Sequence, residues 1–234
     1  MRRFGFLLGI LTVFFSVFSS ISADTVVLWD FRKADVLKGR YPLTLRGKSV
    51  IKNDGLFVPA GAFNERAGAM TTKDNLAEFF EENFSASVKF SISSQEKHTS
   101  PNLVLLDNKY IFKSSKKGDD CGFMLFLKQG KNSNEYIPCA AFGYGNESAA
   151  VYGNSFKLSF NKTYTLKMVY DCRGKVQFFL DNVLCAGCKV PAKKIAKAKL
   201  PLHIGDRVGA AHWQLGGTIE SVEIRKKYKE FISI

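Results

Sequence analysis

Apolar and polar residues alternate along most of the chain beyond residue 24, which is the pattern of half-buried β-strands. In 85–92, the apolar residues Ala86, Val88, Phe90 and Ile92 occupy every second position, and serine or lysine fills the others. The same alternation recurs in three later stretches, 123–127, 164–170 and 176–180. Because successive residues of a strand point to opposite faces, each stretch predicts a strand with one side on a core.

Breaks in the alternation predict how the strands are connected. The segment 171–174 predicts a tight turn between two antiparallel strands, with a glycine at the position that needs unusual backbone angles. The apolar positions between 219 and 224 change phase by one residue, which predicts a β-bulge. One short helix is expected over 74–83, with Asp74 as its N-cap.

Many short strands without alternating helices predict an all-β fold, an antiparallel β-sandwich. Hydrophobic residues make up 46% of the 234-residue chain, enough for a packed core and too many for a disordered protein. No Pro- or Ser-rich linker and no internal repeat divides the sequence. We therefore expect one domain over residues 24–234.

The first 23 residues have the composition of a signal peptide. Arg2 and Arg3 form a positive end, an apolar stretch follows over 4–18, and small residues lead to Ala23. This stretch is shorter than the ~20 residues of a membrane-spanning helix, which disfavours the alternative of a retained anchor. We expect an N-terminal signal peptide helix over 1–23 that is cleaved after Ala23. The mature protein is then expected to lack a transmembrane segment and to be secreted, periplasmic or at the cell surface.

The chain is strongly basic. Its 34 lysines and arginines exceed its 21 acidic residues, which gives a formal net charge of +13. Five of the lysines fall within the segment 189–199, and such a run attracts anions at long range. Lys193, Lys194 and Lys197 are therefore candidate contacts for an acidic polysaccharide, although a solvated loop would show the same composition. Nucleic acid is a disfavoured partner because no recognition motif accompanies the charge.

Five cysteines are an odd number, so at least one cannot pair within the chain. Cys185 and Cys188 form a CAGC motif, which in redox proteins has a helix that lowers the thiol pKa. Strand-like sequence surrounds the motif here, which disfavours redox chemistry. A disulfide and simple apolar packing both stay open. Without a second CxxC motif, the sequence does not indicate a four-cysteine zinc site.

Several segments, in their order along the chain, resemble one superfamily of β-sandwich domains. They include LWDF at 28–31, FSASVKFSIS at 84–93, YTLKMVYD at 164–171, LHIG at 202–205 and GGTIESVEI at 216–224. This succession resembles the laminin-G-like modules of the concanavalin A-like lectin/glucanase superfamily. The resemblance implies a jelly-roll sandwich, a fold that hosts lectins, adhesion modules and hydrolases. Trp29, within the first of these segments, is expected in the core.

The resemblance raises the question of a glucanase, whose paired carboxylates lie on one face of a strand. The nearest match in this chain is Glu220 with Glu223, and that spacing points the two to opposite faces of a regular strand. Asp119 and Asp120 are expected to solvate a turn, and the three histidines lack metal-binding spacing. A glycoside hydrolase is therefore disfavoured, and no catalytic residue is assigned.

Aromatic residues beside predicted strands are the candidate sugar contacts. Trp213, with His212 beside it, precedes the last strand. An indole there can stack on a sugar ring while the histidine supplies a hydrogen bond. Tyr144 and Tyr152 flank a glycine-containing stretch and offer the same chemistry. Packing of Trp213 on the core is the alternative.

A calcium ion at the rim of the sandwich is a further expectation from the resemblance, since members of this fold often bind Ca²⁺ through hard oxygen ligands. Asp107, Asn108 and Asp206 are the candidate ligands, without a fixed spacing to support them. Together, these features predict an exported, non-catalytic module that binds carbohydrate or an acidic surface polymer. The alternatives are a structural or adhesive module that binds a cell-surface protein and, less favoured, a glycoside hydrolase of the same fold.

Overall fold

A computed structural model of the chain describes residues 25–62, 65–72, 76–98, 100–109, 118–209 and 213–226. The predicted signal peptide over 1–23 lies outside these residues, as does the candidate contact His212. Within the described ranges, no helix is long and apolar enough to cross a membrane.

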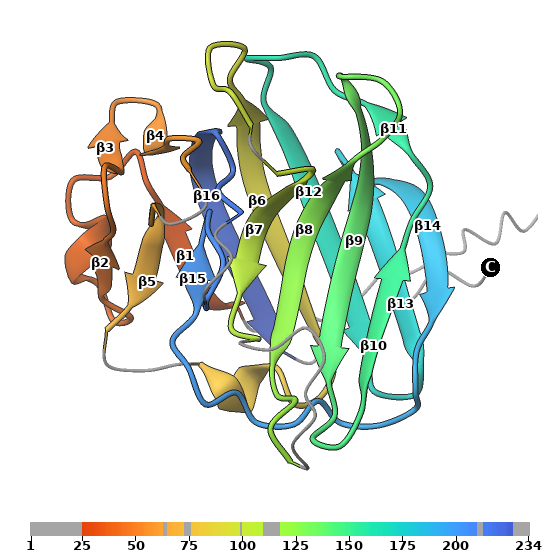
Figure 1. Cartoon of the computed structure of the whole chain (residues 1–234). Helices are drawn as coiled ribbons and strands as arrows, with labels where there is room; N and C mark the ends of the chain where they lie inside the picture. The colour runs from red at the N-terminus through yellow and green to blue at the C-terminus, as the bar shows by residue number, and fades with distance from the viewer. Residues whose placement is uncertain are drawn as a thin grey trace, which may run out of the picture.

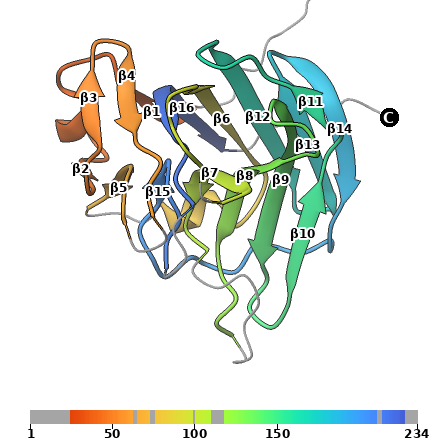
Figure 2. The same ribbon diagram turned by 45° about the horizontal axis from the view of Figure 1, so that its top comes forward.

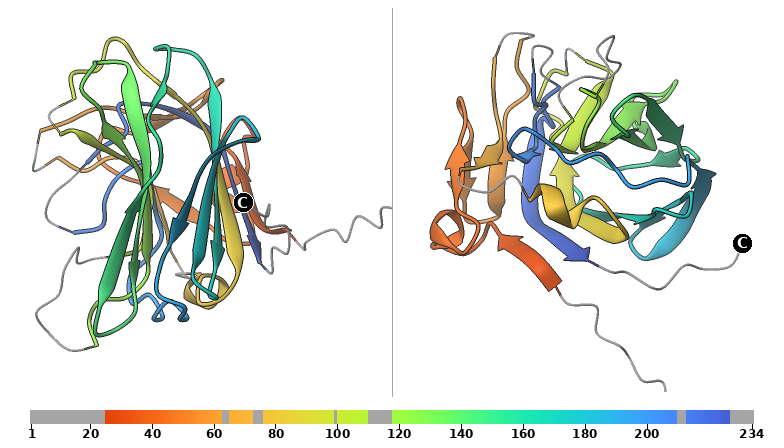
Figure 3. Two further views of the ribbon diagram at one scale, coloured as in Figure 1. Left: turned by 90° about the vertical axis from the view of Figure 1, so that its right-hand side faces the viewer. Right: turned by 90° about the horizontal axis from the view of Figure 1, so that it is seen from below.

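The described residues form two antiparallel sheets that lie face to face (Figures 1 and 3). Sheet A has the order β14–β13–β12–β6–β16–β4–β3, and β1 also pairs with β16. Its strands are β1 (Thr25–Asp30), β3 (Val50–Lys52), β4 (Gly55–Val58), β6 (Phe84–Ile92), β12 (Tyr164–Asp171), β13 (Lys175–Leu180), β14 (Val183–Lys189) and β16 (Gly217–Lys226). Sheet B has the order β10–β9–β8–β7–β15–β5–β2, and β11 also pairs with β9. Its strands are β2 (Leu43–Leu45), β5 (Ala69–Thr71), β7 (Asn102–Asp107), β8 (Phe123–Gln129), β9 (Glu135–Gly143), β10 (Ser148–Tyr152), β11 (Phe156–Lys157) and β15 (His203–Ile204).

The predicted strands are confirmed where the alternation is strongest. In β6, every apolar position between 84 and 92 is buried against the core. Strands β12 and β13 form the predicted hairpin, and Gly174 in its turn has a φ of 100° that favours glycine. In β16, Ile219 and Ser221 pair with consecutive residues of β6, so Glu220 is the extra residue of the predicted bulge.

The predicted helix over 74–83 is wrong. Asp74, the predicted N-cap, lies outside the described residues, and within 76–83 the structure has only a 3-10 helix, η2 (Ala77–Phe79). Leu76 before it adopts a left-handed conformation with a φ of 55°. A segment this short gains little from helical hydrogen bonding, since isolated helices below about 12–15 residues are marginal. Leu76 and Phe80 are instead buried in the core, so tertiary packing determines the local conformation.

Aromatic side chains from both sheets fill one end of the core. The ring centroid of Phe80 lies 5.2 Å from that of Phe84 in β6 and 4.6 Å from that of Phe123 in β8. Tyr170 of β12 lies 4.8 Å from Phe142 of β9. Each of these contacts adds to the area-based stabilisation of the core, and together they join sheet A to sheet B.

Two features close the sandwich at its margins. The segment 190–202 runs from β14 in sheet A to β15 in sheet B across the lower end in Figure 1, and its residues Ile195 and Ala198 are buried. On the right of Figure 2, β10 and β14 lie side by side, and Asn154 Nδ2 donates to the Cys185 carbonyl at 2.8 Å. The edges of both sheets are therefore held together there.

Candidate functional site

The outer face of sheet B carries an apolar cluster that is separate from the main core. Its buried members are Val104, Met124, Phe126, Cys139 and Ala141. They alternate along β7, β8 and β9 with residues that face the main core, and half-buried Ile137 and Trp213 pack against them. These five side chains are 0–2% exposed, so they form a small second core, and the candidate binding surface is the exposed groove beside it.

An open groove of about 810 Å³ lies on this side of the molecule, where β8 turns into β9. Its volume falls within the range of about 300–1,000 Å³ that small-molecule sites occupy. The side chains that line it include Lys128, Lys131, Glu135, Ile137, Asn154 and Ser155. The groove combines two cations, one carboxylate and neutral hydrogen-bonding groups with an apolar side chain, a set that suits a polar ring such as a sugar.

Tyr152 stands beside the groove at the end of β10. Its side chain is 50% exposed, and the Lys128 ammonium group lies 5.6 Å from the centroid of its ring. Gly153, the next residue, lines the groove. The ring is an exposed aromatic platform with a cation beside it, which agrees with the role predicted for Tyr152, and we keep that role as a proposal.

Trp213 lies further along the same face. Its ring is 6.2 Å from that of Phe126, and the Arg207 guanidinium carbon lies 4.5 Å from its ring centroid. The indole therefore packs on the outer cluster of sheet B rather than on the main core, and a guanidinium group lies over its ring. Tyr152, Cys139 and Phe126 are successive cross-strand neighbours. At a strand spacing of about 4.8 Å, the two aromatic–cation pairs are roughly 10–15 Å apart.

Arg207 is an incompletely paired cation of this face. It is only 9% exposed, and its Nε atom is buried without a hydrogen-bond partner. The Oδ2 atom of Asp107 lies 3.9 Å from that Nε. Burial raises the pKa of Asp107 to about 8, although N–H donors and nearby cations oppose the shift. At neutral pH the carboxyl group is mostly protonated, and it offsets little of the Arg207 charge.

Tyr144 does not form part of this face. It packs half-buried against the main core, with its buried hydroxyl group toward that of Tyr170. Burial raises the pKa of Tyr144 to about 12. Its ring belongs to the core boundary rather than to an exposed platform, which corrects the prediction for this residue.

The lysine run lies at the other end of the sandwich. Lys193 is paired with Glu147, and Lys194 with Glu82 at 2.6 Å, whereas Lys197 is exposed. The segment bonds to the Gly143 end of β9, about 20 Å along that strand from the groove at a rise of about 3.4 Å per residue. The structure therefore does not bring the predicted lysines into one site with Tyr152 and Trp213, and two of the three lysines share their charge with acids.

The side chains of the predicted calcium ligands are engaged in hydrogen bonds to the backbone. Asp107, Asn108 and Asp206 are buried, and their side-chain oxygens accept backbone N–H groups at 2.7–3.0 Å. Among the residues that the structure describes, no three His, Cys, Asp or Glu side chains could hold a metal ion together. These oxygens act as acceptors that fix the backbone at the ends of β7 and β15, and the calcium role of the three residues stays a prediction.

The bulge does not turn Glu220 and Glu223 into a catalytic pair. Burial pushes the pKa of Glu220 up, but hydrogen bonds from Lys89 and Thr163 hold it below its usual value. Glu223 contacts Arg225. A general acid of a glycosidase needs a raised pKa, and Glu220 has the opposite.

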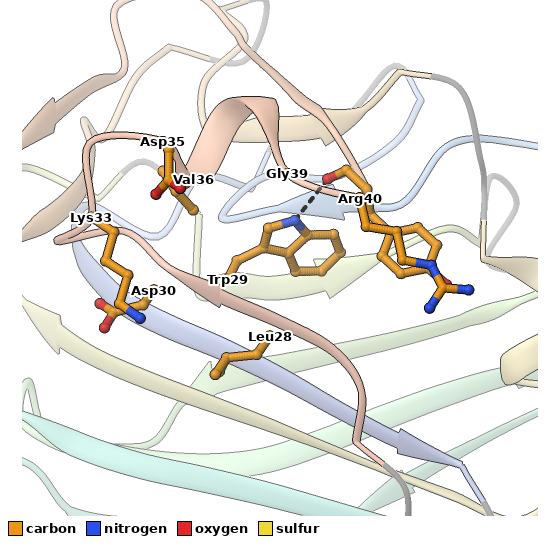
Figure 4. Close-up of a pocket in the computed structure, with 9 residues that line it drawn as sticks. Leu28, Trp29, Asp30, Lys33, Asp35, Val36, Gly39 and Arg40 are labelled. Atoms are coloured by element: carbon orange, nitrogen blue, oxygen red, sulfur yellow. Dashed lines mark hydrogen bonds between the residues drawn. The ribbon is translucent and has the colours of Figure 1, made fainter.

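A smaller cavity of about 210 Å³ lies between β1 and the 3-10 helix η1 (Val36–Lys38), as Figure 4 shows. Trp29 lines it and is 3% exposed, which confirms its predicted place in the core, and its Nε1–H donates to the Tyr41 carbonyl at 2.9 Å. The Arg40 guanidinium carbon lies 5.3 Å from the Tyr41 ring centroid. Because both rings are covered, this cavity offers less aromatic surface than the groove.

The five cysteines are free thiols in the structure. The CAGC motif lies in β14, and burial raises the pKa of both Cys185 and Cys188. A reactive cysteine has a lowered pKa, so these features agree with the packing interpretation.

Lys128 and Arg207 are site residues that sequence reasoning missed. Lys128 occupies an ordinary solvent-side position of a strand, and no local pattern marks it. Arg207 follows Asp206 in a short loop. It becomes a candidate site residue only because the fold places its guanidinium group against the ring of Trp213. A single charged residue carries no local sequence signal that would distinguish either Lys128 or the buried Arg207 from other lysines and arginines.

Solved structures with this architecture include several proteins of low sequence identity. Domain 4 of AbnA, an extracellular GH43 arabinanase from Geobacillus stearothermophilus solved with arabinotriose, has a TM-score of 0.57 and 16% identity, over 87% of this chain and 93% of that chain. The CBM40 of the Ruminococcus gnavus IT-sialidase has a TM-score of 0.54 and 14% identity, over 80% and 93%. A botulinum neurotoxin type C structure, reported for cell entry that depends on two ganglioside molecules, has a TM-score of 0.53 and 13% identity, over 81% and 44%.

These likenesses establish the fold. The protein is an all-β sandwich of two antiparallel sheets with the concanavalin A-like architecture that the sequence resemblance implied. No protein-family model matches the chain, and no curated protein does.

Proposed function

We propose that the protein is an exported, non-catalytic carbohydrate-binding module whose ligand lies in the groove on the outer face of sheet B. The observation that carries the proposal is the exposed Tyr152 ring with Lys128 beside a groove of about 810 Å³. A sugar ring has apolar C–H faces and polar edges. Tyr152 supplies a surface for the first, and Asn154 and Ser155 supply hydrogen-bonding groups for the second.

The cations on this face favour an acidic carbohydrate. Lys128 and Lys131 line the groove together with one carboxylate, Glu135, and Arg207 lies further along the face, 9% exposed and without a hydrogen-bond partner for its Nε. The separation of roughly 10–15 Å between Tyr152 and Trp213, at about 4.8 Å per strand, suits an oligosaccharide that spans both. The arabinotriose of the arabinanase domain and the gangliosides of the neurotoxin support a glycan as the class of ligand.

Two further parts of the proposal rest on the sequence. Residues 1–23 have the composition of a signal peptide, and an extracellular arabinanase contains a domain of this fold, which supports export. The single domain over 24–234 is likewise proposed from the uninterrupted pattern of strands. The lysine run, with Lys197 exposed, would attract an acidic polymer at long range without forming the groove contacts.

A glycan array read at two salt concentrations, with and without Ca²⁺, tests the proposal. We expect binding to acidic glycans that weakens with salt and that Tyr152→Ala reduces. Phe160→Ala is the matched control, because Phe160 is 39% exposed and lies in the connection from β11 to β12. Absence of glycan binding under every condition would refute the proposal and favour an adhesive module that binds protein. Sugar release that Glu220→Gln abolishes would show a hydrolase instead.

A further inference from the structure

Lys109 is a buried cation just beyond the end of β7. Its side chain is 1% exposed, and its ammonium group contacts Asp120, whose side chain is 4% exposed. Lysine and aspartate are almost never buried this fully unless they are paired. Asp107, two residues earlier, interacts electrostatically with the same ammonium group. The cation therefore lies where the sequence resemblance led us to expect calcium ligands.

A calcium ion does not fit these donors. Calcium takes six to eight oxygen ligands, whereas the side-chain oxygens of Asp107 already accept the N–H groups of Lys109 and Val208. Asn108 Oδ1 accepts the N–H of Phe123. An ammonium group carries one charge and three N–H donors, so it can balance one carboxylate without drawing on these oxygens.

We propose that Lys109 is a built-in cation that takes the place of a metal ion at this rim, so that the protein organises its binding face without calcium. The ammonium group is covalently part of the chain and is present whenever the chain folds. Calcium concentration, which would control a metal site, then has no influence on this face.

The geometry connects Lys109 to the candidate binding face. Asp120 is held in place by two backbone hydrogen bonds with Gly145, at 2.7 and 3.2 Å. Asp107, which interacts with the Lys109 ammonium group, lies 3.9 Å from Arg207 Nε, and Arg207 lies over Trp213. Asp107 therefore connects Lys109 to the candidate binding face. Any effect of Lys109 on ligand binding rests on the proposed function, whereas its effect on folding does not.

Thermal unfolding of the full chain tests the proposal. Lys109→Ala leaves Asp120 as a buried charge without its partner, and we expect the Tm to fall by about 6–20 °C. Millimolar Ca²⁺ should not restore that loss, because the side-chain oxygens of Asp107 and Asn108 still accept backbone N–H groups in the variant. The matched control is Lys109→Ala combined with Asp120→Asn, which should be more stable than Lys109→Ala and indifferent to Ca²⁺. Wild type should keep its Tm in EDTA and in Ca²⁺.

Two results would overturn the proposal. The first is a wild-type Tm that EDTA lowers or Ca²⁺ raises, and this measurement decides the matter even if Lys109→Ala does not fold. The second is a Lys109→Ala variant that matches the wild-type Tm or whose lost stability Ca²⁺ restores. A failed glycan array would refute the proposed function and leave these Tm values interpretable, so the two failures are distinguishable.

Discussion

Asp107 makes the stability of the protein depend on pH in an unusual direction. Burial raises the pKa of this carboxyl group from 3.8 to about 8. A group whose pKa is higher in the folded state binds its proton more tightly there, so its contribution to stability is complete below pH 3.8 and is lost as the pH rises toward 8. Between pH 5 and 7, the unfolded chain is ionised at this residue and the folded chain is protonated. The free energy of unfolding should therefore fall by about 1.4 kcal/mol per pH unit.

Urea or thermal unfolding at pH 5, 6 and 7 measures this slope, and Asp107→Asn removes it. The loss of one carboxylate acceptor in Asp107→Asn shifts stability by a constant that does not depend on pH. For a chain of this length, the slope of wild type corresponds to about 3–6 °C in Tm per pH unit. Burial lowers the pKa of His98, which makes the free energy of unfolding rise with pH in the same window. The quantity to compare is therefore the difference in slope between wild type and Asp107→Asn, since both contain His98. Equal slopes in wild type and Asp107→Asn would refute the reasoning.

Three further predictions follow from particular contacts. Lys175 and Lys189 are directly opposed across β13 and β14, so Lys175→Gln should raise the free energy of unfolding by about 0.2–1 kcal/mol in urea titrations, and by less at high salt. A Cβ at residue 143 would lie 2.4 Å from the Asp120 backbone, so Gly143→Ala should lower the free energy of unfolding by about 1–3 kcal/mol. A Gly143→Ala variant as stable as wild type would contradict this close contact. Isothermal titration of an acidic glycan should show weaker binding at pH 9 than at pH 7, because ionised Asp107 then offsets Arg207; equal affinities would contradict this.

Much of the fold was predictable because burial of one sheet face imposes a period of two on the sequence. That period predicted β6 and the β12–β13 hairpin, and its change of phase predicted the bulge at Glu220. The failure over 74–83 has the opposite cause. Leu76 and Phe80 are spaced as on a helix, yet each is buried in a core whose other walls come from distant segments.

The candidate site was less predictable because its contacts join segments that no local pattern relates. Tyr152 could be nominated as an aromatic residue near a turn. The stacking of Arg207 on Trp213 and the pairing of Lys109 with Asp120 depend on loops that meet only in the folded chain. Asp120 was expected to solvate a turn and is instead 3% exposed, which corrects that prediction. Charged residues are read as exposed by default, so buried ion pairs are the features that such reasoning misses.

Equilibrium titration of the tightest acidic glycan from the array against matched variants tests the central claim most directly. Tyr152→Ala should weaken binding by about 30-fold or more, as expected when an aromatic hot spot worth about 2 kcal/mol is truncated. Phe160→Ala should bind like wild type, and all three proteins should unfold at similar temperatures. Unchanged affinity in Tyr152→Ala, or an equal loss in Phe160→Ala, would contradict a carbohydrate site on the outer face of sheet B.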